Sequence, residues 1–219
     1  MNILILHAHI EPDSFCSSLK NLAFEHFTAN GDTVEISDLY QMGFNPVASR
    51  SDFKSVAQEK PFNYLKEQIF AFQNNSFSDE ITTEMQKFVR ADLLLLNFPL
   101  WWSSVPAIMK GWLDKVLALG FSYHPRDKKY ETAPFRGKKA LCTITAGGSS
   151  AAYTSEGENG DIMESLFHLH HGTLYYCGLD VLPPFITWRT HLTDEETLKG
   201  YLNDYKIYLE NIDFNNKLY

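Results

Sequence analysis

The amino-acid sequence predicts an α/β fold, a doubly wound parallel sheet with helices on both faces. Two observations predict it. Short apolar runs alternate along the 219 residues with segments in which apolar side chains recur at the helical period. The runs themselves are nearly free of charge, which is typical of strands buried on both faces. Strands of this kind, each followed by a helix, indicate right-handed crossovers between parallel neighbours.

The expected elements follow in chain order. The first strand, residues 2–6, is apolar, and the helix at 17–29 begins after Asp13 or Ser14, either of which suits a helix N-cap. The third strand, residues 92–97, contains the uncharged run 93–96, and Pro106 suits the first position of the helix at 106–117. The other strands are expected at 33–36, 139–144 and 180–186, and the other helices at 79–91, 160–176 and 194–210.

Five such strands fit a flavodoxin-like sheet with the strand order 2-1-3-4-5. We expect one domain, residues 1–219, with an insertion at about 38–78 that a minimal sheet does not need. A connection of this length is usually functional or part of an interface. In this topology the loops after the first, third and fourth strands meet at the carboxyl edge of the sheet, where ligands bind.

Charge and composition disfavour several partners. The net charge of −8 argues against nucleic acid and anionic membranes. No apolar run approaches the roughly 20 residues that span a bilayer. The three cysteines form no CxxC pair, and Cys142 and Cys177 lie in apolar runs, which indicates reduced thiols. Because the first residues also lack the basic start of a signal peptide, we expect a cytoplasmic protein.

The segment at 97–106 contains the strongest local signal. Trp101 and Trp102 stand in a tight turn between the third strand and the following helix. Wide, flat side chains at the carboxyl edge suit a planar aromatic ligand. The alternative is that both tryptophans only pack in the core or in an interface.

Two further loops strengthen the first reading. Ser14 caps a helix whose free N–H groups favour an anion such as a phosphate, with His9 as an extra donor. The fourth strand ends in Gly147-Gly148, where the backbone can approach a flat ligand closely. Neither the dinucleotide fingerprint nor the lysine of a P-loop is present.

These loops and their surroundings resemble one family. The shared residues are His9-x-x-x-x-Ser14-Phe15, Asp38-Leu39-Tyr40, Phe44-Asn45-Pro46, Phe98-Pro99-Leu100-x-Trp102, Val105-Pro106-Ala107-Ile108-x-Lys110-Gly111-Trp112, Gly147-Gly148 with Tyr153, Cys177-Gly178 and Leu209-Glu210-Asn211. They recur in order over nearly the entire chain. The sequence is therefore similar to NAD(P)H:quinone oxidoreductases of the DT-diaphorase type.

The resemblance implies a flavodoxin-like homodimer with a shared active site and one FAD per subunit, FMN being the alternative flavin. NAD(P)H would reduce the flavin, which would then reduce a quinone by two electrons in a ping-pong cycle. Azo or nitro compounds are further expected acceptors.

The resemblance also implies roles for individual residues. Tyr153 and Asn159 would be catalytic, with Tyr153 stabilising negative charge that develops on the flavin. Trp102, Tyr123 and Tyr176 would line the substrate pocket. The flavin would contact His9, Ser14, Phe15, Cys16, Asn63, Pro99, Leu100, Trp101, Trp102, Ser103, Thr145, Ala146, Gly147, Gly148 and Tyr153.

Some positions depart from the family pattern. Asn159 stands where the family has a histidine, and an amide donates a hydrogen bond but does not become charged near neutral pH. Ser103 replaces an aromatic residue beside the ring, and Cys16 replaces an asparagine in the phosphate loop. These changes bear on the substrate range and the efficiency of the enzyme more than on its fold.

Three other interpretations have less support. His168-x-His170-His171 lacks cysteine or carboxylate partners at ligand spacing, so we expect no metal site. A regulatory subunit of a potassium-efflux transporter would use the same scaffold to signal flavin occupancy. An FMN electron carrier would work without NAD(P)H. The double tryptophan and the long insertion favour an enclosed substrate pocket over the exposed face of such a carrier.

Overall fold

A parallel sheet forms the centre of the molecule. The computed structural model describes residues 1–212, 214 and 216–219. Within them the sheet has the order β2-β1-β3-β4-β5, and a further strand, β6, also pairs with β4. The strands are β1 (Asn2–His7), β2 (Thr33–Asp38), β3 (Leu93–Pro99), β4 (Lys139–Ala146), β5 (Asp180–Val181) and β6 (Phe185–Trp188). All pairs are parallel, which confirms the predicted flavodoxin-like topology.

The predicted fifth strand at 180–186 is wrong in one respect, because two short strands occupy its place. β5 pairs with the start of β4, and β6 pairs with the end of β4. Pro183 and Pro184 lie between them and have no N–H to donate to a neighbouring strand. The Leu182 N–H still reaches the Ala140 carbonyl at 2.9 Å, so the ladder is interrupted at the prolines.

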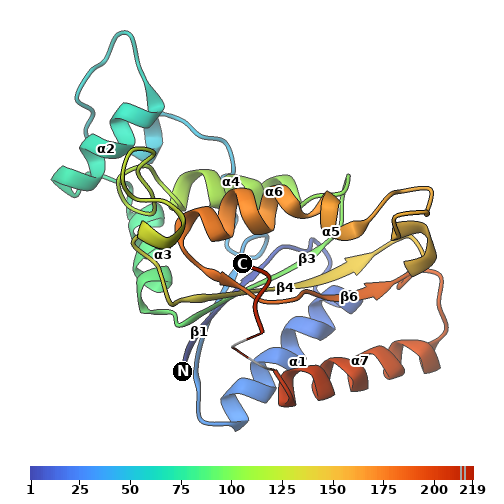
Figure 1. The fold of residues 1–219 in the computed structure, drawn as a ribbon. Helices are drawn as coiled ribbons and strands as arrows, with labels where there is room; N and C mark the ends of the chain where they lie inside the picture. Colours follow the sequence, from blue (N-terminus) through green and yellow to red (C-terminus); the bar gives the residue numbers. More distant parts are fainter. Residues whose placement is uncertain (213, 215) are drawn as a thin grey trace.

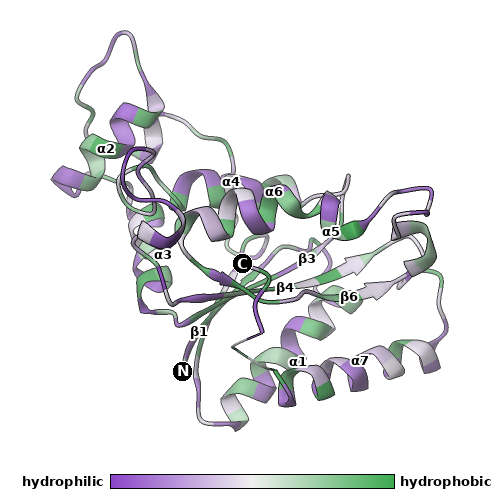
Figure 2. Cartoon of the chain, viewed as in Figure 1, coloured by the Kyte–Doolittle hydropathy of each residue, from purple (hydrophilic) through white to green (hydrophobic). Residues whose placement is uncertain are grey.

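Helices cover both faces of the sheet (Figure 1). α1 (Phe15–Ala29) and α7 (Glu195–Glu210) lie on one face, while α3 (Asp79–Arg90), α4 (Ala107–Val116), α5 (Ile162–Ser165) and α6 (Phe167–Leu169) lie on the other. Each face has its own hydrophobic core. Hydrophobic and hydrophilic residues alternate along α1 and α7, as expected of helices that bury one side (Figure 2).

The single helix predicted at 160–176 is wrong. After α5 and α6 the chain passes through a π-helical turn, His170–Leu174, and a 3₁₀ turn, Tyr175–Cys177. The apolar period shows that one side of this segment is buried, but it does not distinguish an α-helix from wider or tighter windings. π-Helical turns occur mostly as single turns and frequently near functional sites.

The insertion contains a helix that the sequence did not predict, α2 (Tyr64–Asn74). A buried ion pair of 2.9 Å joins Lys115 of α4 to Asp52, which also accepts a hydrogen bond of 2.8 Å from the Tyr64 hydroxyl. Gly111 makes this approach possible, because a Cβ there would lie 2.4 Å from the Cα atom of Pro46. The insertion is therefore fixed against α4 at the end opposite the carboxyl edge (Figure 1).

Candidate active site

The turn between β3 and α4 has a strained backbone. Trp101 and Ser104 exchange two backbone hydrogen bonds of 3.0 and 3.1 Å, and the two residues between them, Trp102 and Ser103, have φ values of 51° and 56°. This is the pattern of a type I′ turn, which usually contains Asn-Gly because both central residues need positive φ. A residue with a side chain pays of order 1–3 kcal/mol at such a position.

The turn presents its aromatic side chains to the outside. The side chain of Trp102 is fully exposed, at 101%, and Trp101 is 42% exposed. A large apolar residue held in a strained conformation without any packing inside its own chain does not serve the stability of that chain. Both features indicate a surface that receives a ligand or another subunit.

The turn after β4 gathers the two residues that the resemblance assigns to catalysis. A Cβ on Gly148 would lie 2.7 Å from Cε2 of Tyr153 and 3.7 Å from the side-chain nitrogen of Asn159. The Asn159 N–H also donates to the Ala152 carbonyl at 2.9 Å. Glycine is thus required at 148, and it brings the phenol and the amide to the same edge as Trp102. Thr145 is buried, and its carbonyl accepts from the Leu100 N–H at 2.8 Å.

The loop after β1 ends in a capped helix. The Ser14 side chain accepts from the Ser17 N–H at 3.1 Å, which leaves the N–H groups of Phe15 and Cys16 in a first turn without intrahelical acceptors. The Cys16 side chain is directed inward, because its thiol donates to Asn97 at 3.3 Å and burial raises its pKa to about 12. His9 is half-buried, and its ring accepts from the Glu11 N–H at 3.0 Å.

Three of the predicted site residues lie elsewhere in the chain. Asn63 caps α2 by accepting from the Lys66 N–H at 3.1 Å. Tyr123 and Tyr176 have ring centroids 5.5 Å apart and line a hollow of about 560 Å³ beside α2 and α4. Burial raises the pKa of both phenols, which keeps them neutral. β4 and β6 point to the right of Figure 1, whereas α2, beside which this hollow lies, is at the upper left, so these predicted residues lie away from the turn after β4.

Comparison with known proteins identifies the family. The family model described as "Flavodoxin-like fold" matches residues 1–209. Human ribosyldihydronicotinamide dehydrogenase [quinone] is 42% identical over 199 residues, covering 90% of this chain and 86% of the human protein. Guinea-pig NAD(P)H dehydrogenase [quinone] 1 is 39% identical over 210 residues, covering 95% and 76%. The chain belongs to the family of flavodoxin-like quinone dehydrogenases.

A solved member of this family superposes closely. A candidate quinone reductase from Klebsiella pneumoniae has a TM-score of 0.94 and 35% identity, covering 100% of this chain and 87% of that one. The match spans the strained turn, the paired glycines and the insertion, so the arrangement of these segments belongs to the family scaffold.

Sequence reasoning missed the loop after β6, which also reaches this part of the quinone dehydrogenase fold. The Arg189 N–H donates to the carbonyls of Ala146 and Gly148 at 2.8 and 3.2 Å, and Arg189 has a φ of 54°. The His191 ring lies 3.5 Å from the place of a Cβ on Gly147. The rule that all carboxyl ends share one edge, applied to the last strand as well, is the signal that would have found them.

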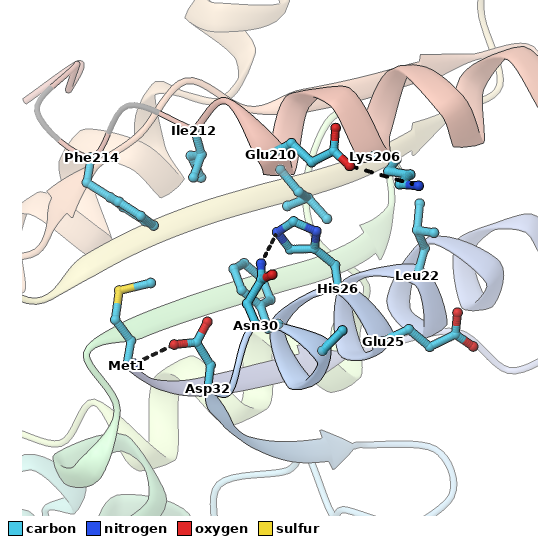
Figure 3. Close-up of a pocket in the computed structure, with 13 residues that line it drawn as sticks. Met1, Leu22, Glu25, His26, Asn30, Asp32, Lys206, Glu210, Ile212 and Phe214 are labelled. Carbon is cyan, nitrogen blue, oxygen red and sulfur yellow. Dashed lines mark hydrogen bonds and ion pairs between the residues drawn. The ribbon is translucent and has the colours of Figure 1, made fainter.

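A different hollow, of about 660 Å³, lies at the amino edge between α1 and α7 (Figure 3). Most of its polar side chains pair with one another, Glu25 being the exception among the residues that the structure describes. The amino group of Met1 bonds to Asp32, the His26 ring lies 3.1 Å from the Asn30 amide, and Lys206 lies 3.9 Å from Glu210.

In the part of the chain that the structure describes, no helix has the length and apolar character needed to cross a membrane.

Proposed function

We propose that this protein is an FAD-dependent, two-electron NAD(P)H:quinone oxidoreductase of the cytoplasm. The observation that carries the proposal is the exposed Trp102 indole, held in a strained turn at the same sheet edge as Gly148, Tyr153 and Asn159. One sheet edge offers a surface for each part of a flavin nucleotide: a flat apolar face suits its ring and a polar edge suits the carbonyl side of that ring. The helix N-terminus at the same edge suits its phosphates. The family membership and the names of the relatives support the same activity.

The fit of a flavin can be followed residue by residue. Pro99, Leu100 and Trp102 would form the wall against the ring, with Trp101 and Ser103 beside it. Thr145, Ala146, Gly147 and Gly148 would face its polar edge, and His9, Ser14, Phe15 and Cys16 would hold the phosphates through the first turn of α1. The bound flavin would supply hydride chemistry, and the chain would supply binding and electrostatics.

Tyr153 would donate a hydrogen bond to the edge of the ring on which negative charge develops, with the Asn159 amide as a second donor. Because asparagine stays neutral, it would not store a proton as a histidine would. Tyr153→Phe should slow flavin reduction in rapid mixing at least tenfold while flavin affinity changes less than about threefold, since one charge-stabilising donor typically contributes more to the rate than to ground-state binding. Equal reduction rates would remove this role.

A second copy of the chain would complete the pocket. Tyr123 and Tyr176 line the hollow beside α2 and α4, and Asn63 caps α2, whereas Trp102 stands in the turn after β3. We propose a two-fold dimer in which this hollow of one protomer faces the Trp102 turn of the other, and an isologous interface would then repeat this contact twice. The quinone, or an azo or nitro compound, would enter between them.

The deciding experiment is the absorbance spectrum of the purified protein with mass analysis of the released cofactor. We expect a yellow protein that releases FAD and oxidises NADH or NADPH in the presence of menadione. Because some relatives are named for ribosyldihydronicotinamide, dihydronicotinamide riboside is included as a third reductant. A colourless protein that neither FAD nor FMN reconstitutes would refute the proposal, and released FMN without NAD(P)H oxidation would favour an electron carrier.

A further inference from the structure

A side-chain hydrogen bond joins the strained turn to the helix that crosses above it. The Ser104 hydroxyl lies 2.9 Å from Nε2 of His168, and Nδ1 of the same ring lies 2.9 Å from the Ser165 carbonyl. A carbonyl only accepts, so Nδ1 carries the proton, and in the neutral ring Nε2 accepts from Ser104. His168, in α6, thus bridges the turn and the end of α5.

The turn has few other restraints. Two backbone hydrogen bonds between Trp101 and Ser104 close it against the strain of two residues with positive φ. The Trp102 side chain, being fully exposed, has no packing that would hold its place. The direction of the indole therefore depends on the backbone of the turn, and the backbone of the turn depends on Ser104.

The helical end of the bridge is well anchored. Leu169 is buried, the Thr173 hydroxyl donates to the His168 carbonyl at 3.0 Å, and the rings of Phe167 and His171 stack with centroids 4.7 Å apart. Because the backbone at His168 is held in place, the His168 ring restrains Ser104 rather than moving with it.

We infer that His168 is a positioning residue that holds Ser104 and thereby sets the Trp102 indole in the orientation that receives a planar cofactor. The part of this inference that concerns the cofactor rests on the proposed function. An ordered turn binds more tightly because less conformational freedom is lost when the ligand arrives. The expected consequence of losing the bridge is weaker flavin binding without loss of the fold.

Substitutions of His168 can test the contacts of its two ring nitrogens one at a time. His168→Gln keeps an acceptor at the distance of Nε2, so it retains the contact with Ser104. His168→Asn places its amide at the level of Nδ1, where it can donate to the Ser165 carbonyl but cannot reach the turn. Ser104→Ala removes the same contact from the other side, and the double variant Ser104→Ala/His168→Asn completes a mutant cycle.

The experiment titrates flavin-free protein with FAD and follows tryptophan fluorescence. We expect His168→Asn and Ser104→Ala each to raise the Kd threefold to tenfold, the double variant to match the single ones, and His168→Gln to stay within twofold. Thermal unfolding should be nearly unchanged in all four variants. An unchanged Kd in His168→Asn, or additive effects in the double variant, would overturn the inference.

A second readout does not need the cofactor. The Ser104 amide donates to the Trp101 carbonyl, and its hydrogen exchange in flavin-free protein should be at least fivefold faster in His168→Asn than in His168→Gln. Equal exchange would overturn the positioning role. If the unmodified protein failed to bind FAD or FMN, the proposed function would fall, while this exchange measurement would still decide whether His168 orders the turn.

Discussion

The amino and carboxyl edges of the sheet differ in backbone strain and exposed aromatic surface, and the volume of the hollow at the amino edge does not reveal this difference. The hollow at the amino edge measures about 660 Å³, yet most of its polar side chains already pair with one another (Figure 3). Beside its lining residues Asn30 and Asp32, the positive φ falls on a glycine, Gly31. The carboxyl edge has the strained residues Trp102, Ser103 and Arg189 and an aromatic side chain without packing. Strain and exposed aromatic surface coincide at the carboxyl edge, which makes it the candidate functional edge, because folding alone would select against both.

The contrast has a chemical meaning. A ligand at the amino edge would have to displace contacts such as that between Met1 and Asp32, which gains little. A flavin at the carboxyl edge would cover exposed apolar surface and meet N–H groups that have no acceptor within the helix. The predictions that follow test whether the two edges differ in function as this contrast implies.

The largest expected difference concerns cofactor affinity. Trp102→Ala should raise the Kd for FAD about tenfold to a hundredfold, because stacking of a flat heterocycle on an aromatic side chain contributes roughly 1–3 kcal/mol. The matched change at the amino edge, His26→Ala, should leave the Kd within twofold. Fluorescence titration of flavin-free protein measures both. Comparable losses in the two variants would break the distinction between the edges.

Acid should weaken the helical segment that supports the carboxyl edge. Burial lowers the pKa of His170 to about 4, and within the described part of the chain its two ring nitrogens have no hydrogen-bond partner. The unfolded chain then binds more protons than the folded one, so stability is complete above pH 6.5 and is lost as the pH falls toward 4. His170→Leu should therefore gain about 2 kcal/mol relative to the unmodified protein on going from pH 8 to pH 5.

Urea unfolding at the two pH values measures this gain. The comparison between pH values removes any effect that leucine has on packing, since such an effect is present at both. If the difference between the two proteins were the same at pH 5 and pH 8, His170 would not be buried in its neutral form.

Substitutions that change backbone strain should shift the free energy of unfolding in opposite directions at the two edges. Ser103→Gly should raise the free energy of unfolding by about 0.5–1 kcal/mol, because glycine adopts positive φ without steric cost. At the amino edge, Gly31 has a φ of 83° and free space around it, so Gly31→Ala should lower stability by about 1 kcal/mol through strain alone. Changes of the same sign in urea unfolding would show that the turn at Trp102 is not strained.

Sequence periodicity was enough for the layers of this fold and for the edge at which its site lies. Continuous apolar runs identify strands such as β3 because both faces of the sheet are covered. The position of Trp102 and Gly148 at one edge then follows from the handedness of the crossovers. The family motifs supplied the residue roles, which periodicity does not contain.

The remaining features depend on three-dimensional contacts. α2 is held where Asp52, Lys115 and Tyr64 meet, and Lys115 is far in the chain from the other two. The π-helical turn at His170–Leu174 keeps the same apolar period as an α-helix. A list of motifs also does not reveal that Tyr123 lines the hollow beside α2 and α4, while Trp102 stands in the turn after β3.

The smallest expected effect is at the amino edge itself. Lys206 and Glu210 lie 3.9 Å apart on α7 with 60% and 48% of their side chains exposed. Because exposed pairs of this kind contribute little, Lys206→Ala should change the free energy of unfolding by at most about 0.5 kcal/mol. Flavin affinity and turnover with menadione should not change, since the hollow would have no part in either. A severalfold loss of turnover in Lys206→Ala, with stability preserved, would make the amino edge a functional site and would end the contrast drawn between the two edges.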